Sequence, residues 1–129
     1  MQTSKVIHLH TTDGLSVVLS SFGATWLSCQ VPVLGNDKKR EILLGCRTDD
    51  LPKQDAYLGS IVGRYANRIA NAQFSLNGQD YRLSANENGN TLHGGADNFA
   101  YRNWDVAEQS DNHVTFSLIG ASDLYIRRK

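Results

Sequence analysis

Residues 58–95, LGSIVGRYANRIANAQFSLNGQDYRLSANENGNTLHGG, contain two polar clusters that are joined by a predicted β-hairpin. The first cluster includes Asn67 and Arg68, and the second is centred on His93, which precedes two glycines. Asn and Arg present planar, forked hydrogen-bond donors, and His can donate or accept. Glycine lets the backbone take positive φ and come close to a bound molecule. The two clusters together predict a binding site for a neutral ligand that is rich in hydroxyl groups.

The hairpin between the clusters is predicted from Asn77-Gly78, the strongest short signal for a type I′ turn. It lies between two strand-forming runs, 73–76 and 79–83. Apolar and polar side chains alternate along both runs, so one face of the hairpin is expected to be buried. We interpret this hairpin as a scaffold and not as part of the chemistry.

Strand-forming runs also flank this central stretch on both sides. The expected strands are 5–11 and 15–20 around the Asp13-Gly14 turn, 26–33, 41–44 after a turn at 34–38, and a last hairpin of 102–109 with 113–118. The basic residues 38–40 are interpreted as part of the solvated turn. No helical period of ten or more residues and no internal repeat is found. The sequence therefore predicts an all-β, antiparallel fold.

Composition restricts the class of protein. With 129 residues, 40% hydrophobic and 20% charged, the chain is expected to be a soluble globular domain or part of a larger one. Thirteen basic residues balance thirteen acidic ones, which disfavours nucleic acid, an acidic membrane surface or a polyanion as the partner. The sequence shows no signal peptide and no apolar run near the length of a membrane span. We therefore expect a cytoplasmic protein that does not associate with a membrane.

No metal or redox site is expected from the histidines and cysteines. Cys29 and Cys46 form no C-x-x-C motif, and small buried apolar residues are the favoured interpretation. His8 and His10 share one face of a predicted strand, together with Val6. A zinc site would need a third ligand at a suitable spacing, and none is found. Solvated strand histidines are therefore the favoured interpretation.

Three motifs in the central stretch carry a family resemblance. They are GRYANRI (63–69), the hairpin FSLNGQDYRL (74–83) and N-x-LHGG (90–95), followed by Trp104. In order and spacing they resemble the aldose 1-epimerase (galactose mutarotase) family. The resemblance runs from about residue 6 to residue 118, and family members are well over twice as long. It implies a large, twisted antiparallel β-sandwich, present here as a partial, N-terminal piece over residues 1–118.

The resemblance also implies a reaction, the interconversion of the α and β anomers of aldohexoses such as galactose and glucose. A base takes the proton of the anomeric hydroxyl, an acid protonates the ring oxygen, and the ring opens and closes again. In the family the acid is a mid-chain histidine and the base is a glutamate near the C-terminus, and both would lie beyond residue 129. No catalytic residue is therefore identified within the chain. Asn67, Arg68 and His93 are carried over as substrate-binding residues, with no metal and no organic cofactor.

Structural alternatives exist for both polar clusters when the resemblance is set aside. The arginines and the asparagine of 63–69 could satisfy loop carbonyls at the rim of a sheet. A histidine beside glycines is more often structural than a ligand-binding group.

The tail 119–129, IGASDLYIRRK, lacks the acidic, glycine- and proline-rich turn that follows in the family. It has only the preceding strands to cover Leu124, Tyr125 and Ile126, and we hypothesise a frameshift or truncation near residue 119.

Three hypotheses follow for the chain: an aldose 1-epimerase, a non-catalytic sugar-binding remnant, or a β-sheet fragment that self-associates through an uncovered sheet edge.

Overall fold

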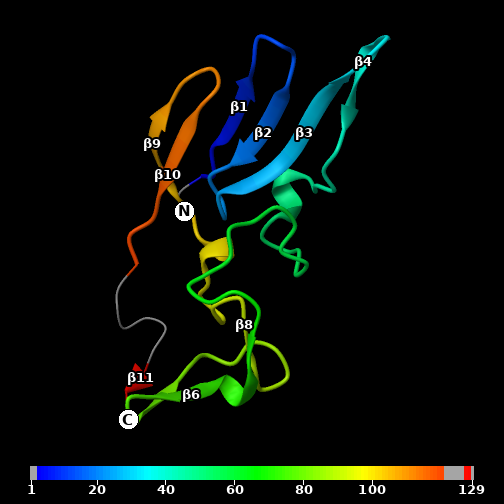
Figure 1. Cartoon of the computed structure of the whole chain (residues 1–129). Coiled ribbons are helices and arrows are strands. Elements are labelled where there is room, and N and C mark those ends of the chain that lie inside the picture. The colour runs from blue at the N-terminus through cyan, green and yellow to red at the C-terminus, as the bar shows by residue number, and fades with distance from the viewer. Residues whose placement is uncertain (1–2, 121–126, 129) are drawn as a thin grey trace. The chain divides into compact units, whose positions relative to one another are not determined.

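The computed structural model describes residues 3–120 and 127–128, and the chain divides into two compact units (Figure 1). Unit 1 comprises Met1–Ile61 and Asn103–Leu118, and unit 2 comprises Val62–Arg102 and Ile119–Lys129. All strand pairs are antiparallel over the described residues. The helical segments found there are three-residue 3-10 turns, η1 (Thr48–Asp50), η2 (Ala70–Ala72) and η3 (Phe99–Tyr101). The predicted all-β, antiparallel class is confirmed.

Unit 1 is built on a four-stranded sheet in sequential order. Its strands are β1 (Val6–His10), β2 (Ser16–Ser20), β3 (Thr25–Val33) and β4 (Asn36–Glu41), and β9 (Asp105–Gln109) with β10 (Val114–Ser117) forms a separate hairpin. The backbone N–H of His10 donates to the carbonyl of Asp111 at 2.8 Å, which ties the turn of this hairpin to the end of β1. Figure 1 shows β9 and β10 on the β1 side of the sheet, away from β4. Both predicted hairpins of this unit are confirmed.

The core of unit 1 lies on one face of β1–β3. Along β1 the alternation is as predicted, with Ile7 buried and Leu9 half-buried on one face, and with His8 and His10 exposed on the other. The buried cluster consists of Val17, Leu19 and Cys29, with Leu9, Leu15, Val31, Leu43, Val114 and Phe116 packed against it. Cys29 thus occupies the small apolar position that was expected of it.

The turn predicted at 34–38 is present but shorter, and the strand predicted at 41–44 is wrong. The turn is Leu34-Gly35, where Gly35 has a φ of 75°, and the charged segment Asn36–Glu41 is the strand. Every residue of β4 is exposed, so this edge strand needs no apolar alternation. The basic residues 38–40 are solvated as expected, although they lie in the strand and not in a turn.

The strand ends at Glu41 for a local reason. The Glu41 carboxylate accepts the hydroxyl of Ser28 and the backbone N–H groups of Cys29, at 2.8 Å, and Leu43, at 2.9 Å. The N–H of Leu43 is thus directed to a side chain and not to a strand partner. These donors favour the ionised form, and with the Ser28 hydroxyl as the largest contribution they lower the pKa of Glu41 to about 2.

Unit 2 contains two small antiparallel ladders. The first has the order β11-β7-β6, with β6 (Gln73–Leu76), β7 (Gln79–Arg82) and β11 (Arg127–Arg128), and the second pairs β5 (Arg68–Ile69) with β8 (Thr91–Leu92). The predicted Asn77-Gly78 turn is confirmed, because both residues have positive φ, at 52° and 75°.

The expectation of a buried face on the β6–β7 hairpin is only partly met. Phe74 and Tyr81 are half-buried, and their rings stack with centroids 5.0 Å apart. Leu76, on the same face, is 55% exposed. The alternation of side chains along the strands could not reveal this ring stacking.

The tail is described only at Ile119, Gly120 and β11, where Arg127 is paired with Arg82. The expectation for Leu124, Tyr125 and Ile126 lies outside the described residues. Among residues 3–120 and 127–128, no helix is long and apolar enough to cross a membrane.

Candidate functional site

The pairing of β5 with β8 brings the two predicted polar clusters together. In this ladder Arg68 is opposite Leu92, so Asn67 precedes one strand and His93 follows the other at the same end. The backbone N–H of Asn67 donates to Nδ1 of His93, and the backbone N–H of His93 donates to the carbonyl of Asn67, both at 3.0 Å. Two residues that are 26 positions apart in the chain are thereby joined by two hydrogen bonds.

This contact determines how the His93 ring is presented. Because Nδ1 accepts a hydrogen bond, the proton of the neutral ring lies on Nε2, which becomes the donor of the ring. Asn67 and His93 both have positive φ, at 62° and 51°. This left-handed conformation costs a non-glycine residue on the order of 1–3 kcal/mol and persists only where the surroundings enforce it, typically at functional sites.

Arg68 is held by a residue that sequence analysis missed. Its Nε and Nη2 donate to the two carboxylate oxygens of Glu87, at 2.8 and 2.6 Å, and Nη1 donates to Oδ1 of Asn67 at 3.1 Å. The bidentate pairing fixes the plane of the guanidinium. Three of its five N–H groups are used in these bonds, which leaves two for a ligand. No sequence signal indicated Glu87, because it lies 19 residues from Arg68 in a polar loop.

The Arg68–Glu87 pair has a consistent electrostatic signature. Hydrogen bonding to the Arg68 guanidinium, with the positive charge of Arg68 as a smaller contribution, lowers the pKa of Glu87. Glu87 in turn raises the pKa of Arg68. Glu87 is therefore ionised at neutral pH and acts here as an acceptor that orients Arg68.

Gly94 is required by the close approach of two backbone segments. It has a φ of 100°, and a Cβ at this position would lie 1.8 Å from the carbonyl oxygen of Gly63. Any side chain would push apart the segments that carry the two clusters. The expected role of the glycines after His93, a close approach of backbone, is thus seen at Gly94 between two parts of the chain itself.

Two asparagines hold the loop that carries His93. Asn86 donates from Nδ2 to the carbonyl of Leu92 at 3.0 Å and accepts the Leu92 N–H at 2.7 Å. Asn98, which is fully buried, donates to the carbonyl of Gly95 at 2.8 Å and caps η3 by accepting the N–H of Ala100 at 2.9 Å. Sequence analysis singled out neither residue. A short polar residue before a 3-10 turn was the available signal for Asn98.

The assembled group offers donors rather than an acid–base pair. His93 is half-buried and Asn67 and Arg68 are exposed, so this group of polar side chains lies at the surface of unit 2. Such donors suit the oxygens of a polyhydroxyl ligand. Within residues 3–120 and 127–128, no three His, Cys, Asp or Glu side chains are grouped so that they could hold a metal ion.

Comparison with known proteins gives one consistent family. The sequence model of the family "Aldose 1-epimerase" matches residues 5–124. An aldose 1-epimerase of Haemophilus influenzae is 52% identical over 114 residues, which are 88% of this chain and 33% of the relative. A galactose mutarotase of Rattus norvegicus is 34% identical over 109 residues, or 84% of this chain and 31% of the relative.

The same family is found among solved structures. A crystal structure of an aldose epimerase homologue from C. elegans superimposes with a TM-score of 0.82 and 34% identity, over 90% of this chain and 36% of that chain. This agreement confirms the predicted galactose mutarotase type of fold. The chain spans about a third of the length of the curated relatives that it matches, and the matched third is their N-terminal part. The chain belongs to the aldose 1-epimerase family.

Proposed function

We propose that this chain supplies sugar-binding residues of an aldose 1-epimerase, which interconverts the α and β anomers of aldohexoses such as galactose or glucose. The observation that carries the proposal is the double hydrogen bond between Asn67 and His93, with Arg68 fixed beside them. The names of the matched relatives, an aldose 1-epimerase and a galactose mutarotase, support the reaction class.

In this proposal the three side chains orient the sugar. Nε2–H of His93 and the two remaining N–H groups of Arg68 donate to sugar oxygens, and the amide of Asn67 completes the contact. When the ring opens, negative charge develops on oxygen, and the Arg68 guanidinium stabilises it. Glu87 acts through Arg68, because its carboxylate holds the guanidinium plane in place.

The proton transfers need two further groups. Ring opening requires a base at the anomeric hydroxyl and an acid at the ring oxygen, both within hydrogen-bond reach. The Glu87 carboxylate beside these donors is bound to Arg68 through both of its oxygens and is not placed to act as the base. We propose that the acid and the base lie in the two thirds of the family fold that these residues do not include.

A titration with D-galactose tests the binding role. We expect the amide resonances of Asn67, Arg68 and His93 to shift in two-dimensional NMR spectra as the sugar is added. The shifts should be lost in His93→Ala and kept in His113→Ala, which removes an exposed histidine of unit 1. Shifts that persist in His93→Ala, or their absence in the unsubstituted chain at saturating sugar, would refute the proposed role.

A second proposal concerns association of the isolated chain through a sheet edge. β6 is the edge strand of its ladder, its sequence QFSL carries no charge, and Leu76 is 55% exposed. The edge strand β4 carries Lys38, Lys39 and Arg40, and such charges oppose pairing with another chain. We therefore propose that β6, and not β4, pairs with a second copy.

Sedimentation velocity over a range of concentrations tests this association. Leu76→Lys should shift the chain towards the monomer, because it places a charge on the pairing edge. Leu44→Lys serves as the matched control, since Leu44 is 80% exposed and lies outside the strands. A chain that remains monomeric at high concentration would count against the proposal.

A further inference from the structure

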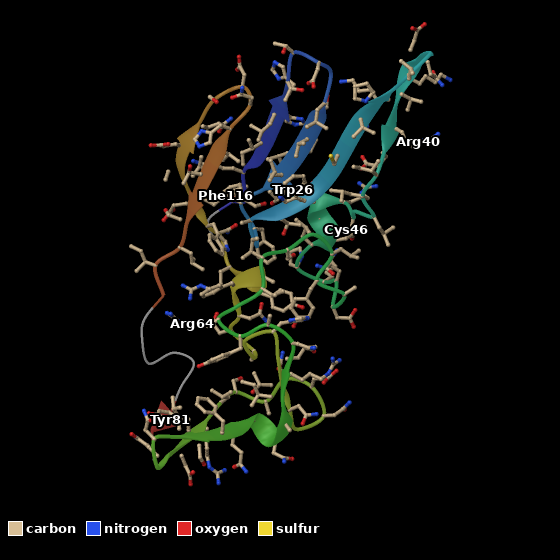
Figure 2. All side chains as sticks on the ribbon, in the orientation of Figure 1. Trp26, Arg40, Cys46, Arg64, Tyr81 and Phe116 are labelled. Atoms are coloured by element: carbon tan, nitrogen blue, oxygen red, sulfur yellow. The ribbon has the colours of Figure 1, made fainter. Side chains whose placement is uncertain are left out.

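Unit 1 has an open apolar hollow with a volume of about 590 Å³. Its walls come from the core-facing side of the sheet and from the β9–β10 hairpin. They include Leu9, Val17 and Leu19 of β1 and β2, Trp26 of β3, and Val114 and Phe116 of β10. Figure 2 labels Trp26 and Phe116 on these two sides of the unit. The hollow is formed by unit 1 alone and is distinct from the group around His93.

Large apolar side chains in the lining are exposed to solvent, whereas a complete hydrophobic core would cover them. Trp26 and Ile61 each line it and are each 44% exposed. The turn residues Thr11, Asn112 and His113 also line the hollow and contribute polar side chains to it. An apolar concavity with polar residues at its border is typical of a surface that binds another polypeptide. A sugar would leave most of these apolar groups without a complementary contact.

The structural comparison provides the argument for the occupant of this surface. Nine tenths of the chain superimpose on 36% of the C. elegans homologue with a TM-score of 0.82. The chain therefore already has the conformation of one third of a larger fold, and the other two thirds of that fold are not among its residues. An apolar face of such a third needs packing partners from the rest of the fold.

We propose that the hollow is the docking surface for a polypeptide that carries the remaining two thirds of an aldose 1-epimerase fold. The inference rests on the shared fold and on the exposed lining, and not on the sugar-binding role of His93. A second copy of this chain is a poor occupant. A two-fold symmetric dimer places the same patch of both copies in contact, so that hollow faces hollow and neither is filled.

Complementation in trans tests the proposal. The 129-residue chain is co-expressed with the part of the Haemophilus influenzae aldose 1-epimerase that follows its matched third. We expect a one-to-one complex in analytical ultracentrifugation. With 5-fluorotryptophan incorporated into this chain only, the ¹⁹F resonances of Trp26 and Trp104, which both line the hollow, should shift when the complex forms.

Charged substitutions in the lining separate this surface from others. Trp26→Asp and Ile61→Asp should each weaken the complex by roughly a hundredfold, because docking would bury an unpaired carboxylate. Leu34→Asp is the matched control, since Leu34 is fully exposed in the turn between β3 and β4. Circular dichroism verifies that each variant keeps its β-structure, and two lining positions guard against one that fails to fold.

The outcomes are distinct. The proposal is overturned if no complex forms, if the complex tolerates both lining substitutions, or if the ¹⁹F shifts arise from the chain alone as its concentration rises, which would assign the hollow to a second copy. A complex that forms without binding galactose supports the docking surface and refutes the sugar-binding role. Galactose binding by a chain that forms no complex supports the sugar-binding role and refutes the docking surface.

Discussion

Nδ1 of His93 accepts the backbone N–H of Asn67 at 3.0 Å, and the carbonyl of Asn67 accepts the backbone N–H of His93 at the same distance. The contact links the end of β8 to the start of β5 and determines which nitrogen of the ring can donate to a ligand. The imidazole thus has a structural role and a proposed binding role, which different measurements can separate.

His93→Ala should loosen the Asn67 backbone. The substitution removes the acceptor of the Asn67 N–H, and a hydrogen bond of this kind contributes on the order of 1 kcal/mol. We expect the Asn67 amide to exchange with solvent about fivefold faster in hydrogen-exchange NMR. The Asn71 amide, whose acceptor is Oδ1 of Asn90, provides the internal reference. An unchanged Asn67 rate would contradict the observed contact.

Gly94→Ala should destabilise unit 2 far more than Gly89→Ala. Both glycines have positive φ, at 100° and 82°, so both substitutions carry the conformational cost of a left-handed residue, about 1–2 kcal/mol. Only at Gly94 would the new Cβ also meet backbone, the Gly63 carbonyl oxygen at 1.8 Å, whereas Gly89 faces open space. We expect a total cost of about 3 kcal/mol or more for Gly94→Ala, measured by urea unfolding. Equal costs for the two variants would show that the close approach does not exist.

Glu87→Gln should weaken galactose binding without unfolding the chain. The amide keeps the shape of the side chain but has one acceptor oxygen and no charge, so Arg68 loses its bidentate partner. We expect an affinity about two- to fivefold lower, on the scale of an exposed ion pair, with an unchanged melting temperature. Asp50→Asn, which removes a surface partner of Lys53 at 3.6 Å, is the control for the loss of one negative charge. An equal loss of affinity in both variants would assign the effect to net charge and not to Arg68.

Glu41 should make unit 1 sensitive to acid in a defined range. Its pKa is about 2 in the folded chain, against an ordinary value of 4.5. A carboxyl with a depressed folded pKa stabilises the fold fully above the unfolded pKa, and this contribution is lost as the pH falls from about 4.5 towards 2. In Glu41→Gln, stability should therefore fall less between about pH 5 and about pH 3, as measured by urea unfolding at both values. A pH dependence that is identical to that of the unsubstituted chain would rule out this role of Glu41.

The elements that were predicted correctly are those whose signal is local. Asn77-Gly78 demands a type I′ turn by its own backbone preferences, and the structure has positive φ at both residues. The alternation in β1 follows from the period of a strand with one face in the core. The assembly of Asn67 and His93 was expected from the resemblance of two motifs, and the β5–β8 ladder brings them together.

The elements that were missed depend on distant partners. An apolar run at 41–44 indicated a strand, but β4 is an edge with no buried face, and the Glu41 carboxylate redirects the N–H of Leu43. Glu87 acquires its role only when a loop brings it to Arg68. Neither contact leaves a pattern in the sequence, because each depends on which segments become neighbours after folding.

Polarimetry of freshly dissolved α-D-galactose tests the central claim that this chain positions the sugar and that another part of the fold transfers the protons. With the 129-residue chain alone, the optical rotation should decay at the buffer rate. With the complementing part of the Haemophilus influenzae relative bound, it should decay faster, and His93→Ala should abolish the gain. Acceleration by the chain alone, or none from a complex that sedimentation shows to be formed, would contradict the account.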